Sequence, residues 1–143
     1  MAIMEQTGKF KMVAKTMFGL EGVLAKELEN MGAENIEQLR RAVSFEGNMS
    51  LLYRANYSLR TALSILKPIA EFDAKDEQAL YRNVYAIKWE KYMNCDAKIY
   101  IDHSVFSTTF THSLYAAQKT KDAICDRFRK MFNFRPQVSK EEY

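Results

Sequence analysis

Several features are scarce in this sequence of 143 residues. It contains two cysteines and two prolines, and it has no apolar run of about 18 residues, the length that a transmembrane helix requires. The opening residues, MAIMEQTGKF, lack the basic start and apolar core of a signal peptide. We therefore expect no membrane segment, and a cytoplasmic chain in which Cys95 and Cys125 are free thiols rather than a disulfide.

The net charge of +3 conceals an uneven distribution. From Lys119 to Lys140 there are seven basic and two acidic residues, a balance of +5, whereas the rest of the chain has 14 basic and 16 acidic residues, a balance of −2. Such a concentration indicates a surface for a polyanion, with a basic but merely solvated helix face as the alternative. The apolar content of 48% is too high for disorder and fits one globular domain or two small ones.

The first part of the chain, after a tail at 1–8, has the pattern of a small α+β domain over 9–72. Expected strands cover 10–15, 36–40, 42–46 and 62–72, and expected helices cover 20–31 and 48–59. Asn48 is the expected N-cap of the second helix, and Pro68 indicates that the last strand lies at an edge or carries a bulge. This order is the ferredoxin-like βαββαβ arrangement. Its expected buried residues are Leu24, Leu28, Val43, Phe45, Leu52 and Ala55.

The second part, 73–143, has fewer strands. Asp76 is a plausible N-cap for a helix that carries Leu80, Val84 and Ile87. Residues 98–106 alternate as a strand does, and a long helix is expected over 114–132, with Thr111 or Ser113 as its cap. The apolar stripe of this long helix consists of Leu114, Ala117, Ile124, Phe128 and Met131. A single strand has no partner within its own unit, so we expect a truncated domain.

Four segments of the chain, taken in order, carry a resemblance to a known family. The first is Met17-Phe18-Gly19-Leu20-Glu21, followed by Glu27-Leu28. The second is Val43-Ser44-Phe45-Glu46-Gly47, followed by Tyr53-Arg54-Ala55-Asn56 and Leu59-Arg60-Thr61-Ala62. The third is Ile87-Lys88-Trp89, and the fourth is Gln118-Lys119-Thr120-Lys121-Asp122-Ala123-Ile124, followed by Arg135-Pro136. Together these segments resemble THUMP-containing RNA methyltransferases, the bacterial class that methylates a guanine N2 in large-subunit ribosomal RNA. The resemblance covers about residues 9 to 140.

The resemblance implies a fold and a function for the whole chain. The fold class is α+β, with a ferredoxin-like domain at 9–72 followed by a truncated α/β THUMP domain at 73–143. Together these domains bind structured RNA in the family, and a Rossmann-like methyltransferase domain that uses S-adenosylmethionine follows them.

The family's glycine-rich cofactor loop and its Asn-Pro-Pro-aromatic motif do not occur in this chain. We therefore expect no catalytic residue and no cofactor here. In the full-length enzyme we expect S-adenosylmethionine as the cofactor, and the missing methyltransferase domain as a partner of this part of the chain. Adenine-N6 methylases share the same catalytic motif, so the modified base stays open.

The candidate RNA contacts lie on and near the long basic helix. Lys119, Arg127 and Lys130 fall near one helical face, with Lys121 and Arg129 on a neighbouring stripe. Lysine acts as a point charge on phosphate and arginine can grip it with two hydrogen bonds, which suits the recognition of duplex RNA through its backbone. The hydroxyl groups of Ser107 and Thr108 are weaker candidates, since a polar loop with a helix cap explains them better. The full candidate set is Lys119, Lys121, Arg127, Arg129, Lys130, Arg135, Ser107 and Thr108.

Four aromatic residues on and after the helix that starts near Asp76 admit two interpretations. One interpretation is that their side chains stack on exposed bases, as in single-strand binding proteins; the other, which their helical spacing favours, is that they pack between the two units. They are Tyr81, Tyr85, Trp89 and Tyr92.

Signs of catalysis or metal binding are weak. Asp102, His103 and Ser104 are the residue types of a hydrolase triad, but neighbours on a strand point to opposite faces and cannot form a relay. The four potential zinc ligands, Cys95, His103, His112 and Cys125, include no closely spaced pair of cysteines or histidines, so we expect no metal. The leading hypothesis is an RNA-binding part of a methyltransferase, and the alternatives are a stand-alone ferredoxin-like interaction module or a small enzyme.

Overall fold

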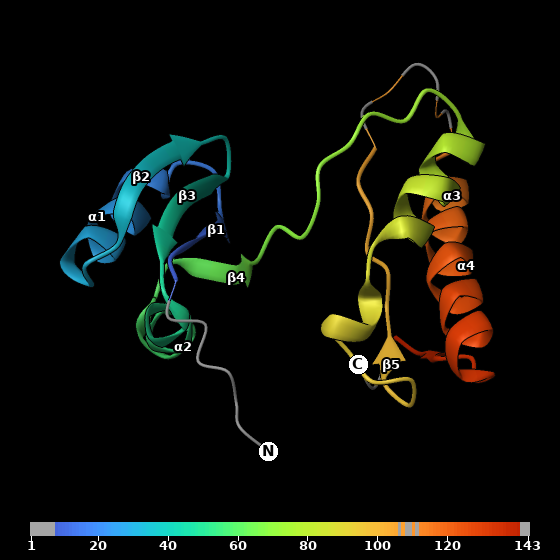
Figure 1. Cartoon of the computed structure of the whole chain (residues 1–143). Helices are drawn as coiled ribbons and strands as arrows, with labels where there is room; N and C mark the ends of the chain where they lie inside the picture. Colours follow the sequence, from blue (N-terminus) through green and yellow to red (C-terminus); the bar gives the residue numbers. More distant parts are fainter. Residues whose placement is uncertain (1–7, 106, 108–109, 111, 141–143) are drawn as a thin grey trace. The chain divides into compact units, whose positions relative to one another are not determined.

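The computed structural model describes residues 8–105, 107, 110 and 112–140. The chain divides at Ile69 and Ala70 into two compact units, each with its own hydrophobic core. Figure 1 shows the first unit as a sheet with two helices and the second as a helix pair with a short sheet. None of the helices in the described part of the chain has the length and apolar character needed to cross a membrane.

The first unit has the βαββαβ order expected from its sequence. Its elements are β1 (Phe10–Thr16), α1 (Glu21–Asn30), β2 (Glu34–Leu39), β3 (Ala42–Gly47), α2 (Met49–Ser58) and β4 (Ala62–Leu66). The four strands form one antiparallel sheet in the order β2-β3-β1-β4, which confirms the predicted ferredoxin-like fold. The strand β4 lies at an edge, as Pro68 indicated, but it ends at Leu66 rather than at Phe72, because proline offers no N–H to a ladder.

The core of this unit forms where the two helices cover one face of the sheet. Alternation along β1 turns Met12 and Ala14 inward, where they pair across the sheet with Phe45 and Val43. Leucines of both helices complete this core: Leu24 and Leu28 of α1, and Leu51 of α2. The expectation for Leu52 was wrong by one position, since Leu51 is buried and Leu52 is only half-buried.

Two positions explain how the chain turns between these elements. Gly32, just after α1, has a φ of +85°. This left-handed conformation is common at the end of a helix and favours glycine, because a Cβ atom would be strained there. A Cβ atom at Gly47 would collide with the side chain of Leu51, so the end of β3 needs a glycine to let α2 approach. Asn48 then caps α2 as predicted, because its Oδ1 accepts a hydrogen bond from the Leu51 N–H at 2.9 Å.

The second unit is a helix pair joined to a short parallel sheet. Its elements are α3 (Glu77–Ala86), a 3₁₀ turn η1 (Trp89–Lys91), β5 (Lys98–Ile99), α4 (Ser113–Phe132) and β6 (Gln137–Val138). The side chain of Asp76 caps α3 through a 2.7 Å hydrogen bond from the Ala79 N–H, as expected. Ser113 is the first residue of α4 rather than its cap, and the alternative cap Thr111 lies outside the described residues.

The sheet of this unit differs from the sequence expectation. The strand expected over 98–106 is limited to Lys98 and Ile99, and it has a partner within its own unit, because β6 pairs with it in parallel. Alternation shows that a segment suits a sheet, but the length of the ladder depends on the partner, and β6 has two residues.

The buried side of α4 is also shifted from the predicted stripe. Ala117, Ile124 and Phe128 are buried as expected, whereas Leu114 and Met131 at the two ends of the helix are 61% and 50% exposed. Ala123 and Cys125 take their place in the core. Cys95 and Cys125 are free thiols, as predicted.

Candidate nucleic-acid interface

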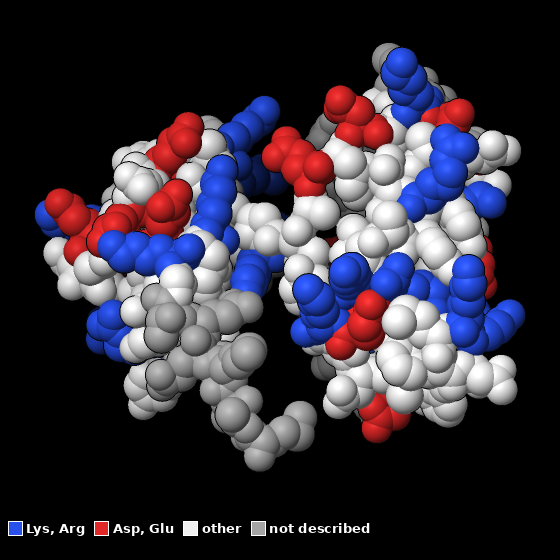
Figure 2. Space-filling view, viewed as in Figure 1, with Lys and Arg blue, Asp and Glu red and all other residues white. Residues whose placement is uncertain are grey.

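Five basic residues on and just after α4 reach the surface, and we call them the basic face. Arg129, Lys130 and Arg135 are exposed, while Lys119 and Lys121 are half-buried. Lys119 and Lys130 are eleven positions apart, about three turns of helix, and therefore lie on the same side of α4. Figure 2 shows a group of Lys and Arg side chains on the side of the second unit that is in view. The basic face comprises Lys119, Lys121, Arg129, Lys130 and Arg135.

Two members of the basic face have neighbours on the same helix. The ammonium group of Lys119 lies 5.5 Å from the centre of the Tyr115 ring, a cation–π distance. Lys121 pairs with Asp122 at 3.1 Å. Both contacts are local and partly exposed, so they cost little to rearrange when a phosphate approaches.

Arg127 belongs to a different set of contacts. Its Nε and Nη2 atoms donate to the two carboxylate oxygens of Glu90 at 2.9 and 2.8 Å, and its Nη1 donates to the backbone carbonyl of Tyr85 at 2.9 Å. The arginine side chain is 15% exposed. Hydrogen bonds from Arg127 hold the pKa of Glu90 at about 2, well below the ordinary value of a glutamate. We therefore leave Arg127 out of the basic face and call this group of contacts the Arg127 clamp.

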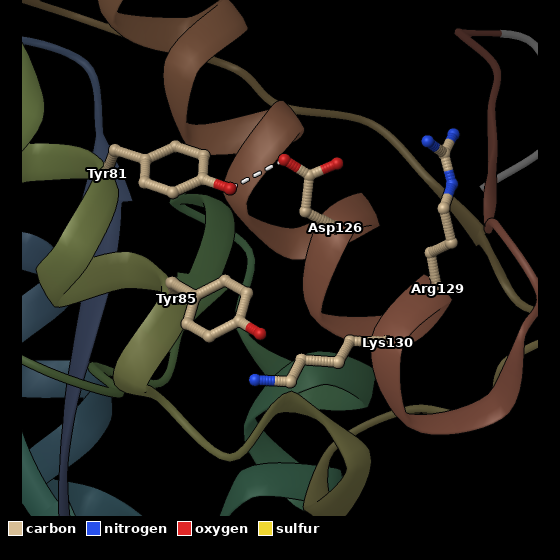
Figure 3. A pocket seen from close by; sticks show the side chains of 5 residues that line it. All are labelled: Tyr81, Tyr85, Asp126, Arg129 and Lys130. Atoms are coloured by element: carbon tan, nitrogen blue, oxygen red, sulfur yellow. Dashed lines mark hydrogen bonds between the residues drawn. The ribbon is translucent and has the colours of Figure 1, made fainter.

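A shallow hollow of about 410 Å³ lies beside α4, lined by residues of α3 and α4. We call it the tyrosine hollow, and its lining residues are Tyr81, Tyr85, Asp126, Arg129 and Lys130. Figure 3 shows the rings of Tyr81 and Tyr85 side by side, with the Lys130 side chain directed toward Tyr85 and that of Arg129 directed away. The two ring planes are 19° apart and their centroids are separated by 6.1 Å.

One hydrogen bond fixes the edge of the hollow. The hydroxyl of Tyr81 donates to Oδ2 of Asp126 at 2.6 Å. This bond, with burial as a smaller cause, raises the pKa of Tyr81 to about 12, so the phenol keeps its proton at neutral pH. The contact joins α3 to α4. Its two residues are 45 positions apart, so no local sequence pattern predicts it.

The four aromatic residues singled out in the sequence divide into two roles. The indole N–H of Trp89 donates to the backbone carbonyl of Val84 at 2.8 Å, and its ring meets Tyr92 at an angle of 62°. Trp89 also packs against the core of the second unit, as do Tyr81 and Tyr85. Only Tyr81 and Tyr85 line the hollow among these four.

The remaining candidates have local contacts. The hydroxyl of Ser107 accepts a hydrogen bond from the Phe110 N–H at 3.3 Å, while Thr108 lies outside the described residues. Oδ1 of Asp102 accepts from the N–H of His103 at 2.9 Å, a turn contact and not a catalytic relay. Among the residues that the structure describes, no group of three His, Cys, Asp or Glu side chains is arranged to hold a metal ion.

Family models match both parts of the chain. Residues 11–66 match the RlmL ferredoxin-like domain, and residues 74–143 match the THUMP domain. Among curated proteins, the chain is 37% identical over 131 residues to ribosomal RNA large subunit methyltransferase K/L of Syntrophotalea carbinolica, and 35% identical over 130 residues to the protein of that name from Photobacterium profundum. These matches include 92% and 91% of this chain, which spans 18% of the length of each relative.

Solved structures share the same fold. A protein assigned as a methyltransferase and crystallised with SAH aligns with 92% of this chain and 36% of its own at a TM-score of 0.80 and 26% identity. A predicted N6-adenine-specific DNA methylase from Listeria monocytogenes aligns with 88% of this chain and 33% of its own at a TM-score of 0.72, again with 26% identity.

Proposed function

Because the chain belongs to the family of proteins that join an RlmL ferredoxin-like domain to a THUMP domain, we propose that it is the RNA-recognition part of a ribosomal RNA methyltransferase. The names of its relatives specify large-subunit ribosomal RNA, which supports structured RNA as the partner. In this proposal the enzyme modifies a guanine N2 in the cytoplasm. Methyl transfer and the binding of S-adenosylmethionine belong to a separate methyltransferase domain of the parent protein.

The single observation that carries the proposal is the basic face. Lys119 and Lys130 lie on the same side of α4, Arg129 and Arg135 are exposed at and after its end, and the acidic residues within α4 are Asp122 and Asp126. Asp122 pairs with Lys121, whereas Asp126 accepts a hydrogen bond from the neutral Tyr81 and keeps its negative charge. The face therefore presents Lys119, Arg129, Lys130 and Arg135 to a polyanion without an equal number of opposing charges.

The chemistry of this face suits the backbone of folded RNA. The deep major groove of an RNA duplex hides its base edges from side chains, so proteins recognise such a duplex by its phosphates, its 2′-hydroxyl groups and its shape. Lysines on a rigid helix can follow the phosphates of one strand without reading the sequence. Specificity for one ribosomal helix then depends on the shape of the RNA and on other parts of the parent protein.

A salt titration of RNA binding tests this proposal. Each phosphate contact that is lost should reduce the slope of log K against log salt by about 0.7–0.9. The triple variant Lys119→Gln, Arg129→Gln, Lys130→Gln should therefore flatten the slope by roughly two to three units for a ribosomal RNA hairpin. Arg127 stays unchanged in this variant, because its loss would also break the Arg127 clamp.

A matched variant separates a specific face from a general effect of charge. Lys11, Lys15 and Arg40 are exposed residues of the first unit, and changing all three to Gln removes the same total charge. We expect this variant to flatten the slope less than the α4 variant does. Equal slopes and affinities for the wild type and the α4 variant, with both proteins folded, would show that the basic face is merely solvated. The stand-alone interaction module would then be the better hypothesis.

A further inference from the structure

The tyrosine hollow differs from the rest of the basic face because it offers aromatic surface as well as charge. We propose that it binds an unpaired nucleobase of the RNA, which lies against the rings of Tyr81 and Tyr85 while its neighbouring phosphates meet Lys130 and Arg129. This inference rests on the proposed function, since it names the part of the RNA, an unpaired base, that the tyrosine hollow binds.

The geometry of the two rings carries the first step. The rings of Tyr81 and Tyr85 are nearly parallel, both line the hollow, and Figure 3 shows them next to each other. Both tyrosines are half-buried, which leaves part of each ring open to solvent. A base in a duplex is covered by its neighbours on both sides, so only an unpaired base can place its own face on this surface.

The charges of the hollow decide which part of a nucleotide enters. A phosphate in the hollow would approach the carboxylate of Asp126 and be repelled by it. A neutral base has N–H donors that the same carboxylate can accept. The two cations suit the phosphates on either side of the bound base. Lys130 extends toward Tyr85 and Arg129 extends outward, where the flanking phosphates of a bound nucleotide would pass.

The hollow is also held in place before any ligand arrives. Asp126 fixes the hydroxyl of Tyr81, and the Arg127 clamp holds the backbone carbonyl of Tyr85, with the guanidinium 6.0 Å from the centre of that ring. A side chain that is already ordered loses little conformational entropy when a ligand binds. Arg127 thus acts as a positioning residue for the ring that receives the base.

The test compares three RNAs with the intact 143-residue chain. One is a blunt-ended RNA duplex, the second is the same duplex with a short single-stranded 3′ tail, and the third has the same tail without its bases. The abasic tail keeps every phosphate, so any difference between the second and third RNA reports the bases alone. We expect the wild type to bind the base-bearing tail at least about fivefold more tightly than the abasic tail, the lower end of typical base stacking on an aromatic residue.

Two substitutions then locate the base. Tyr85→Leu keeps much of the side-chain volume but removes the ring, and we expect it to bind both tails with equal affinity. Tyr85→Phe keeps the ring and should retain the wild-type preference. Thermal unfolding followed by circular dichroism verifies that each variant is folded, and unchanged binding of the blunt-ended duplex shows that the phosphate contacts are intact.

The possible outcomes separate this inference from the proposed function. Salt-dependent binding of all three RNAs with equal affinity overturns the inference and leaves the proposed function standing. A preference for the base-bearing tail that survives in Tyr85→Leu places the base elsewhere and also overturns the inference. Binding of none of the RNAs contradicts both proposals.

Discussion

The two units use their polar side chains for different purposes. In the first unit, acidic side chains close turns: Glu21 accepts from the N–H groups of Gly19 and Arg41, and Glu27 accepts from those of Arg60 and Thr61. In the second unit, polar side chains connect the helix pair and the turn that follows it, through the Tyr81–Asp126 bond and the Arg127 clamp. A surface rich in charge can therefore contain residues that hold the fold beside residues that are available to a ligand.

The cores of the units give the largest expected effects. Phe128 is 1% exposed in α4, and Phe128→Ala should reduce the unfolding free energy of the second unit by about 3–5 kcal/mol. Trp89 is the single tryptophan and lies in this unit, so its fluorescence during urea unfolding reports the change. Leu114→Ala on the same helix is the control, since a side chain that is 61% exposed should cost about 0.5 kcal/mol or less. Equal costs would mean that the buried face of α4 is assigned wrongly.

The corresponding change in the first unit is Leu28→Ala. Leu28 is fully buried in α1, and its truncation should cost roughly 2–5 kcal/mol, measured by amide hydrogen exchange in β1 and β3. Val23→Ala, at a position of α1 that is 51% exposed, should have little effect. We expect Leu28→Ala to leave the Trp89 transition unchanged, because each unit has its own core. A parallel shift of that transition would contradict independent folding of the two units.

The Arg127 clamp should make the second unit sensitive to acid. The pKa of Glu90 is lowered to about 2, so its stabilising contribution is fully present above the ordinary glutamate pKa near 4.5 and is lost as the pH falls toward 2. Glu90→Gln should weaken the unit at neutral pH by less than either core truncation, and its stability should then change less between pH 4.5 and 2. Trp89 fluorescence measures both effects.

A matched glutamate in the first unit sharpens this comparison. Burial opposes ionisation of Glu27, but hydrogen bonds from Thr61 and Arg60 outweigh it and lower the pKa of that carboxyl group. Glu27→Gln should therefore change the acid response of the first unit and leave the Trp89 signal as in the wild type. An acid transition of Trp89 that is identical in the wild type and Glu90→Gln would show that the clamp contributes nothing to stability.

The helix caps give the smallest effects, and they should be similar in both units. Asn48→Ala removes the cap of α2 and Asp76→Ala removes that of α3, each at a cost of about 0.5–2 kcal/mol. Asn48→Ser and Asp76→Ser, which keep a capping oxygen, are the controls. Urea unfolding followed by far-ultraviolet circular dichroism measures all four variants. A loss in the serine variants as large as in the alanine variants would assign the effect to something other than the cap.

The sequence predicts those features that depend on neighbours along the chain. Asn48 and Asp76 are recognisable caps, and the alternation of Met12, Ala14, Val43 and Phe45 is enough to identify two buried strand faces. The limits of β5 are set by β6, which is almost forty positions away, and two residues between turns give no periodic signal. The errors at Leu114 and Met131 have a related cause, because a helix end can continue an apolar stripe beyond the region that a partner covers.

In the candidate site, too, the sequence predicts local features but not contacts between residues that are far apart in the chain. The basic character of the region after Lys119 is visible from composition, and the candidacy of Arg129, Lys130 and Arg135 as RNA contacts remains a prediction. No pattern in the sequence indicates the ion pair of Arg127 with Glu90 or the hydrogen bond between Tyr81 and Asp126. These pairs are 37 and 45 positions apart, so their proximity depends on the packing of α3 against α4.

The parallel pairing of β5 with β6 has a consequence for the order in which the second unit assembles. The pairing joins Ile99 to Val138, and the Ser139 N–H adds one further bond to the Ile99 carbonyl at 3.1 Å. So few hydrogen bonds cannot offset the entropy lost when the chain between β5 and β6 is closed into a loop. We therefore expect α4 to form first, because the helix brings the two strands closer together. Pro136 is buried beside Cys125 of α4, so the helix must dock before β6 reaches its partner. We therefore infer that this strand pair forms last during folding and separates first when the unit opens.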